Sequence, residues 1–200
     1  GPNGSGKTTY MRLLCGLLSP SSGAIRFKGR DSRQMSVSEI ARMITYVPSE
    51  LSSEFPITVR EVVTLGRDVQ ADSRLGFGLS IRPEDTQAVD EAMQATGCME
   101  FSETLIQELS HGQRQLVALS RAIAQGSKII ALDETFSKMD LHHQVKMSRL
   151  LETLAAKGHA ILWVVHDFNL ALDCAHTGLL LDRGKRVAYG KIHEVVNGAI

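Results

Sequence analysis

GPNGSGKTT, Gly1 to Thr9, is the stretch that decides the fold of this sequence. It fits the pattern G-x-x-x-x-G-K-[ST], in which glycines let the backbone wrap closely around phosphate groups. Backbone N–H groups of such a loop point at anionic oxygens beside a helix N-terminus, the lysine adds a positive charge, and the hydroxyl after it reaches Mg²⁺. A Gly/Ser-rich start is also typical of a cloning linker, but a linker does not continue into Lys-Thr-Thr and an apolar helix. We therefore predict a phosphate-binding loop made by Gly1, Pro2, Asn3, Gly4, Ser5, Gly6, Lys7, Thr8 and Thr9.

Composition and charge are those of a globular chain without a general affinity for nucleic acid. Its 200 residues suit one domain, or one domain with an inserted subdomain, and 43% of them are hydrophobic. The 22 Lys and Arg balance the 22 Asp and Glu, whereas a broad grip on nucleic acid needs uncompensated cations. We expect no membrane span, because no run of about 18 apolar residues occurs, and no signal peptide. Cys15, Cys98 and Cys174 are too far apart for a metal motif, so we expect buried thiols in a reducing cytoplasm.

Apolar patterns and helix-capping residues predict that helices and strands alternate along the chain. Such alternation favours right-handed crossovers and a layered α/β core. A polar stretch at 67–82 has no clear period and is interpreted as a variable loop. The expected helices are 10–18, 36–44, 58–66, 83–97, 110–126, 141–158 and a short one within 191–200. The expected strands are 24–28, 45–48, 128–133, 160–165, 179–181 and 186–190.

Four further motifs follow the phosphate loop: LSHGQRQ (109–115), IIALDE (129–134), SKMD (137–140) and VVHD (164–167). In this order and spacing, they resemble the signature, Walker B strand, D-loop and switch histidine of ABC ATPases. The resemblance covers nearly the whole chain. It implies an α/β fold, namely a RecA-like P-loop NTPase core of residues 1–67 and 126–200. A helical subdomain that carries the signature motif would be inserted at 68–125.

The residues that end two buried strands are candidates for the chemistry. Asp133 follows an apolar run, where a carboxylate can hold Mg²⁺ through water. Taken alone, the Asp-Glu pair could be an exposed strand end, and His166 could be a hydrogen-bonded core residue. The resemblance implies instead that Thr8 and Asp133 hold Mg²⁺, that Glu134 orients or deprotonates the attacking water, and that His166 contacts the γ-phosphate of ATP.

Ser110 and Gln113 have the spacing of a capping box, which predicts a helix start. The N–H groups and positive dipole end of that helix suit an anion. The resemblance implies that this anion is the γ-phosphate of ATP on a second subunit, in a head-to-tail dimer that encloses two ATP molecules. The signature residues would then be Ser110, His111, Gly112 and Gln113, with Asp140 in the D-loop. Hydrolysis would be an in-line attack by water, catalysed by positioning and charge neutralisation.

Two stretches are similar to importers of iron-siderophores, heme and cobalamin: FPITVREVVTLGR (55–67) and the run from 139 to 172. The resemblance implies an ATPase subunit on the cytoplasmic face of the plasma membrane. Its partners would be integral membrane permease subunits and, indirectly, an extracytoplasmic binding protein that selects the chelate. His142 and His143 are adjacent on a predicted helix and face different directions, so we assign no metal ligand there.

The sequence departs from the family pattern at three places. Ser49 stands where a glutamine usually follows YVP, and that glutamine reaches the Mg²⁺ and water and couples ATP to the membrane subunits. A serine hydroxyl is too short to replace it directly, although a water could bridge. His111 stands where glycine is usual, and Thr135-Phe136 where Pro-Thr is usual. From Ser49 we expect slow hydrolysis, or hydrolysis weakly coupled to transport.

Three other functions remain open at this stage. A soluble ABC ATPase could act as a nucleotide-gated clamp on DNA or ribosomes, although the balanced charge disfavours it. A catalytically weak, nucleotide-binding regulator is motivated by Ser49 and His111, and phosphate release would distinguish it. A P-loop kinase is the third, and LSHGQ speaks against it.

A phosphate loop of this type directly follows the carboxyl end of a buried strand. The resemblance implies that such a strand, and an aromatic residue that stacks on adenine, lie upstream of Gly1. We expect these 200 residues by themselves to bind ATP weakly and to fold with low stability.

Overall fold

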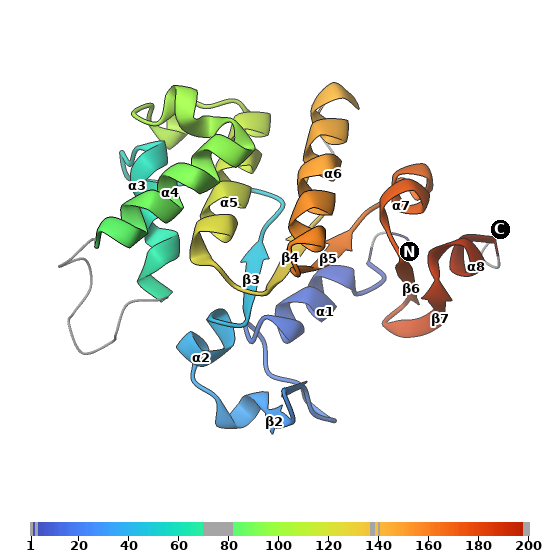
Figure 1. Cartoon of the computed structure of the whole chain (residues 1–200). Helices are drawn as coiled ribbons and strands as arrows, with labels where there is room; N and C mark the ends of the chain where they lie inside the picture. Colours follow the sequence, from blue (N-terminus) through green and yellow to red (C-terminus); the bar gives the residue numbers. More distant parts are fainter. Residues whose placement is uncertain (1, 3, 70–81, 137–138, 140, 198–200) are drawn as a thin grey trace.

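The computed structural model describes residues 2, 4–69, 82–136, 139 and 141–197 (Figure 1). The helices are α1 (Lys7–Leu14), α2 (Val37–Ala41), α3 (Val59–Thr64), α4 (Pro83–Thr96), α5 (His111–Gln125), α6 (Leu141–Ala156), α7 (Phe168–Cys174) and α8 (Ile192–Asn197). Short 3-10 helices are η1 (Ser32–Gln34), η2 (Leu65–Val69), η3 (Cys98–Phe101) and η4 (Ile106–Glu108). The strands are β1 (Arg26–Phe27), β2 (Arg30–Asp31), β3 (Ile44–Val47), β4 (Ile129–Asp133), β5 (Ala160–Val164), β6 (Thr177–Asp182) and β7 (Lys185–Lys191).

Strands β3, β4 and β5 form a parallel sheet with β4 in the middle. Every residue of β4 after the first is buried, as expected for an interior strand of a parallel sheet. The carboxyl ends of parallel strands lie at the same edge. The segments that carry Ser49, Glu134 and His166 therefore leave the sheet at one edge, although they are far apart in the sequence.

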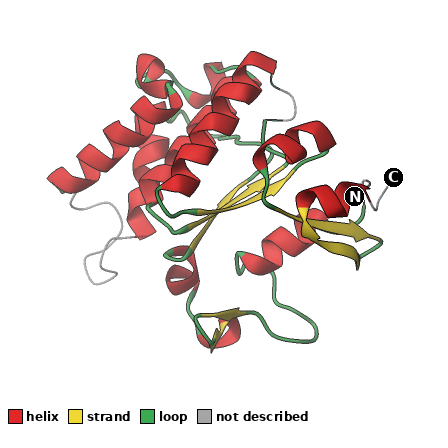
Figure 2. Ribbon diagram, turned by 45° about the vertical axis from the view of Figure 1, so that its right-hand side comes forward, coloured by secondary structure: helices red, strands yellow, loops and turns green. Residues whose placement is uncertain are grey.

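Helices cover both faces of this sheet (Figures 1 and 2). On one face Met11 of α1 and Ile40 of α2 pack against Ile44 and Ala131. This helix–sheet–helix layering confirms the predicted α/β class. The other face is covered by α5 and α6, and its core contains Val47, Leu116, Leu119, Ile130, Leu132, Met147 and Leu151.

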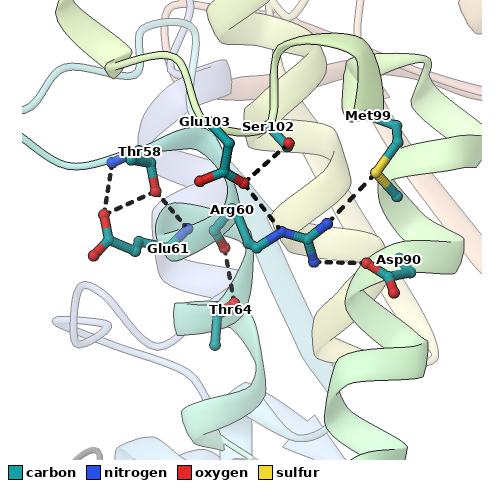
Figure 3. A network of polar contacts seen from close by, with 8 residues as sticks. All are labelled: Thr58, Arg60, Glu61, Thr64, Asp90, Met99, Ser102 and Glu103. Atoms are coloured by element: carbon teal, nitrogen blue, oxygen red, sulfur yellow. Dashed lines mark hydrogen bonds and ion pairs between the residues drawn. The ribbon is translucent and has the colours of Figure 1, made fainter.

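A second apolar core joins α3, α4 and α5, to the left of the sheet in Figure 1. Arg60 links these elements at the surface: its guanidinium lies 2.6 Å from Asp90 of α4 and 3.6 Å from Glu103 (Figure 3). Ion pairs this exposed add little stability, so burial of apolar side chains holds the cluster together. Helix α3 precedes residue 68, and the boundaries of the inserted subdomain at 68 and 125 stay a prediction. The core contains Val59, Val63, Val89, Met93, Ile106 and Val117.

The structure differs from the expected elements at two hairpins. The strand expected at 24–28 is interrupted after Phe27, because Lys28 and Gly29 both have positive φ, 49° and 85°, and turn the chain into β2. The strand expected at 179–181 extends over Thr177–Asp182, because its polar ends pair with β7 across an antiparallel hairpin. Part of the loop expected at 67–82 is the helix η2, and residues 70–81 lie outside the described residues.

The three cysteines are free thiols at different depths. Cys98 is fully buried, while Cys15 and Cys174 are half-buried, so the expectation of burial holds fully only for the first. Burial, with a smaller effect of the Asp133 charge, raises the pKa of Cys15 to about 12. In the part of the chain that the structure describes, no helix is long and apolar enough to cross a membrane.

Candidate functional site

The phosphate loop leads directly into α1, as the sequence predicts. Gly4 and Gly6 have φ of 76° and 97°, a conformation that glycine adopts without a steric penalty. Gly6 is the N-cap of α1 and provides no side-chain hydrogen bond to the first turn. A bound anion can therefore accept from the N–H groups of this turn. Gly1 and Asn3 lie outside the described residues.

Lys7 is the first residue of α1, and its side chain bends back over the loop. Its Nζ donates to the carbonyl oxygen of Pro2 at 2.9 Å and to Ser5 Oγ at 3.5 Å. Ser5 is buried beneath this contact. The ammonium group is thus held at the loop, where the phosphates of a nucleotide would be bound.

Asp133, at the end of β4, meets the phosphate loop through Thr8. Thr8 Oγ1 donates to Asp133 Oδ1 at 3.1 Å, and the hydroxyl of Tyr46 donates to Oδ2 at 2.8 Å. Burial, and then the hydrogen bond to Asp133, raise the pKa of Tyr46 to about 12, so its hydroxyl remains a donor at neutral pH. Sequence reasoning predicted the proximity of Thr8 and Asp133 but missed Tyr46.

A hydroxyl beside a carboxylate is a pair of hard oxygen donors, and this chemistry fits Mg²⁺. Over the described ranges, no cluster of three or more His, Cys, Asp or Glu side chains could hold a metal ion by itself. Mg²⁺ is usually bound by one or two protein groups together with substrate phosphates, and Thr8 and Asp133 are two such groups in contact. The residues present therefore fit the metal ion that the sequence implies.

Glu134 and His166 are brought together from two strands. His166 Nε2 lies 2.8 Å from Glu134 Oε1, and both side chains are partly exposed. The backbone of Glu134 has a φ of 53°, which costs a non-glycine residue about 1–2 kcal/mol. Such backbone strain is frequently found at functional sites. Here the strained residue is Glu134, whose carboxylate pairs with His166.

The signature motif begins α5 with the predicted capping box. Ser110 Oγ accepts from the N–H of Gln113 at 3.2 Å, and Gln113 Oε1 accepts from the N–H of Ser110 at 2.9 Å. His111 is the first helical residue. A side chain on Gly112 would lie 3.5 Å from Met139. Asp140 of the D-loop lies outside the described residues.

A profile described as ABC transporter matches residues 1–137. The chain belongs to the ABC transporter family. It is 34% identical over 197 residues to the iron(3+)-hydroxamate import ATP-binding protein FhuC of Bacillus subtilis, covering 98% of this chain and 72% of that protein. It is 35% identical over 195 residues to the cobalamin import ATP-binding protein BtuD of Halobacterium salinarum, covering 97% of this chain and 46% of that protein. A solved inward-facing structure of a putative metal-chelate type ABC transporter superimposes with a TM-score of 0.81 at 27% identity, covering 98% and 71% of the two chains.

The segment after β3, where the ABC family usually has a glutamine, is joined to the signature helix. The buried amide of Gln115 donates through Nε2 to the carbonyl oxygen of Ser49. Sequence reasoning missed Gln115, although it lies within the quoted signature stretch. The adjoining cavity has a volume of about 370 Å³ and is lined by Glu50, Leu51, Ser52, Ser53, Ile106, Gln107, His111 and Arg114.

The departure from Pro-Thr after Glu134 is accommodated by aromatic packing. Phe136 has a φ of 73° and is buried, with its ring edge-to-face on Trp163 at a centroid distance of 6.1 Å. Trp163 Nε1 donates to the carbonyl oxygen of Thr135 at 3.4 Å. These contacts connect the segment after β4 to β5, which leads to His166.

The turn between β6 and β7 supports the phosphate loop of this ABC protein, which sequence reasoning did not anticipate. The N–H of Gly184 donates to the carbonyl oxygen of Ser5 at 3.0 Å. A side chain on Gly6 would lie 3.5 Å from the Cα of Gly184. Gly184 itself has a φ of 75°, with open space around it. The turn therefore fixes the phosphate loop through its backbone.

We expect Gly184→Ala to weaken ATP binding about tenfold, equivalent to about 1.4 kcal/mol. Alanine is strained at positive φ, so the turn would shift and release the carbonyl oxygen of Ser5. Gly158→Ala is a matched control, because Gly158 has a φ of 88° and is also surrounded by open space. Equilibrium binding of a fluorescent ATP analogue and thermal unfolding measure both variants. We expect both variants to lose a similar amount of stability and only Gly184→Ala to lose ATP affinity. Equal ATP affinities in the two variants would contradict the role of Gly184 in supporting the phosphate loop.

Proposed function

We propose that this chain is the ATP-binding and hydrolysing subunit of an importer for an iron-siderophore, heme or cobalamin-type metal chelate. The observation that carries the proposal is the convergence of the phosphate loop with Asp133 and with the Glu134–His166 pair at one edge of the parallel sheet. The names of the relatives, which describe iron-hydroxamate and cobalamin import ATP-binding proteins, support the substrate class.

The geometry supports a direct role for each residue. Backbone N–H groups of the loop residues after Pro2, up to Thr9, and the ammonium of Lys7 would bind the phosphates of ATP. Thr8 and Asp133 hold Mg²⁺, which, when bound, neutralises charge on the phosphates. Glu134 orients the attacking water and accepts its proton, and His166 fixes the Glu134 carboxylate and approaches the γ-phosphate. Catalysis then comes from positioning and charge rather than from a covalent intermediate.

A second copy of this subunit completes the site in the proposed dimer. The capping box leaves Ser110 exposed at the start of α5, and the helix N-terminus presents a positive dipole end there. Ser110, His111, Gly112 and Gln113 would bind the γ-phosphate of ATP on the opposite subunit, and Asp140 of the D-loop is proposed to contribute to the same dimer. Two such sites form in a head-to-tail dimer.

Integral membrane permease subunits are the proposed direct partners, and an extracytoplasmic binding protein acts through them. This arrangement locates the chain at the cytoplasmic face of the plasma membrane. The exposed Phe55 offers an apolar contact to the permease, close in sequence to the segment that Gln115 connects to the signature helix. No nucleic acid partner is proposed, because the charge is balanced.

The function is tested with the full-length protein and its permease reconstituted in vesicles. ATP-dependent phosphate release together with uptake of a ferric siderophore, heme or cobalamin is the expected result. ATP binding without phosphate release would instead favour a regulator. Co-purification with ribosomes or DNA in place of a membrane subunit would favour the nucleotide-gated clamp.

We expect Ser49→Gln to raise the rate of phosphate release several-fold. The longer amide can reach the water and metal ion that a serine hydroxyl reaches only through a bridging water. The backbone contact from Gln115 to residue 49 is retained in this variant, because it involves the carbonyl oxygen. Ser52→Gln, an exposed serine in the same segment, is the control. If Ser49→Gln releases phosphate no faster than the parent and Ser52→Gln, with or without the permease, Ser49 is not the cause of slow hydrolysis.

A further inference from the structure

Tyr46 reaches from β3 to the carboxylate of Asp133 at the end of β4. Its hydroxyl donates to Oδ2 at 2.8 Å, whereas Thr8 Oγ1 donates to Oδ1 at 3.1 Å. Each oxygen of this carboxylate therefore accepts one hydroxyl hydrogen bond from a different element. Asp133 is only 3% exposed, so these bonds replace much of the hydration that its charge loses.

The direction of Tyr46 follows from the pleat of β3. Ile44 and Tyr46 face α1, while Thr45 and Val47 face the opposite side of the sheet. Tyr46 pairs in register with Ala131, two residues before Asp133 on β4. The side chain of Tyr46 thus lies on the face of the sheet that α1 covers. It extends toward the edge of the sheet where Thr8 meets Asp133.

The two hydroxyl groups are not equivalent in the proposed reaction. Thr8 belongs to the nucleotide site, and its oxygen is itself a proposed ligand of the metal ion. Tyr46 comes from β3 and donates to Oδ2, and its hydroxyl also interacts with Arg12 on α1 rather than with Thr8. Groups that hydrogen-bond to a metal-binding carboxylate orient it and tune its affinity.

We propose that Tyr46 is a positioning residue that fixes the plane of the Asp133 carboxylate, so that Oδ1 stays against Thr8 and the carboxylate is ready to hold a divalent cation beside ATP. The proposal rests on the function proposed above. It adds a residue from β3 to a metal site that the sequence motifs place only on the phosphate loop and on β4.

Tyr46→Phe tests this role, because it removes one oxygen atom and keeps the ring. Mn²⁺ is the probe, and its affinity for the full-length protein with ATP is measured by electron paramagnetic resonance. We expect Mn²⁺ affinity to fall roughly 10- to 100-fold. ATP affinity measured with a chelator present is expected to stay within about twofold of the parent, since the variant leaves the phosphate loop unchanged.

Thr45→Val is the matched control on the same strand. Thr45 is buried, and its hydroxyl donates to Gln125 Oε1 at 2.8 Å on the opposite face of the sheet. Both variants lose a hydroxyl hydrogen bond, so both are expected to unfold at lower temperature, but only Tyr46→Phe is expected to lose Mn²⁺ affinity. If Tyr46→Phe binds Mn²⁺ as tightly as the parent, or if Thr45→Val loses as much Mn²⁺ affinity as Tyr46→Phe, the positioning role of Tyr46 is overturned and the proposed function is not affected. A parent protein that binds no ATP would overturn the proposed function and the inference with it.

Discussion

Glu134→Gln is expected to abolish ATP turnover and to leave ATP binding intact. The carboxylate is the group that can accept a proton from the attacking water, and an amide cannot. General-base groups contribute roughly 10²- to 10⁴-fold to rates, so phosphate release should fall at least a hundredfold. Glutamine retains the size of the side chain and an oxygen that can accept from His166, whose Nε2 lies 2.8 Å from Oε1 in the parent. The left-handed backbone at residue 134 is equally strained in both proteins.

Two measurements on the same preparation separate catalysis from binding. Phosphate release at saturating ATP reports turnover, and the ATP-induced rise in the thermal unfolding midpoint reports binding. Glu152→Gln, an exposed glutamate on α6, is the control for the loss of one negative charge. If Glu134→Gln hydrolyses ATP at the parent rate, Glu134 has no role as the base. If it binds no ATP, its carboxylate is needed to form the site rather than to react.

The sequence predicted the strands of the sheet, and the convergence of the candidate residues at its edge, because both depend on local patterns. Apolar runs such as IIALD identify buried strands, and parallel strands bring their carboxyl ends to one edge whatever the length of chain between them. Asp133, Glu134 and His166 each follow such a run. Their convergence was therefore predictable from the resemblance and the strand pattern, without knowledge of any distance.

The contacts that support the site could not be predicted in the same way. The bond from Tyr46 to Asp133 spans 87 positions and requires β3 and β4 to pair in one particular register. The bond from Gln115 to Ser49 spans 66 positions and depends on how α5 docks against the segment after β3. Nothing in the immediate sequence of Gly184 indicates that it meets the phosphate loop. Register, docking and turn position are set by the packing of the whole domain, so these residues emerge only from the structure.

Lys7→Ala is expected to reduce ATP affinity roughly a hundredfold or more. Hydrogen bonds to charged groups contribute about 1.5–3 kcal/mol, and each 1.4 kcal/mol is a factor of ten. In the structure Lys7 Nζ lies 2.9 Å from the carbonyl oxygen of Pro2, so the ammonium group already lies over the loop that would bind the phosphates. Lys7→Arg keeps the charge but replaces a compact ammonium with a planar fork, and should recover little of the affinity. Lys157→Ala, an exposed lysine after α6, is the control for loss of one positive charge.

In Lys7→Ala the affinity for ATP should fall, whereas the thermal stability of the protein without ATP should not. This difference separates a binding role of Lys7 from a structural one. Lys7 is the first residue of α1, where a positive charge opposes the helix dipole by about 0.3–1 kcal/mol. Its contact to Pro2 is exposed to solvent, which limits what the fold gains from it. Removing the side chain should therefore leave the unfolding midpoint without ATP unchanged or slightly higher, while the rise that ATP produces is lost. A positive charge at this unfavourable position is consistent with a binding role, because a negatively charged ligand at the loop would offset the unfavourable interaction with the helix dipole. Should ATP raise the midpoint of Lys7→Ala as much as that of the parent, the phosphate loop would not be the site where ATP is bound.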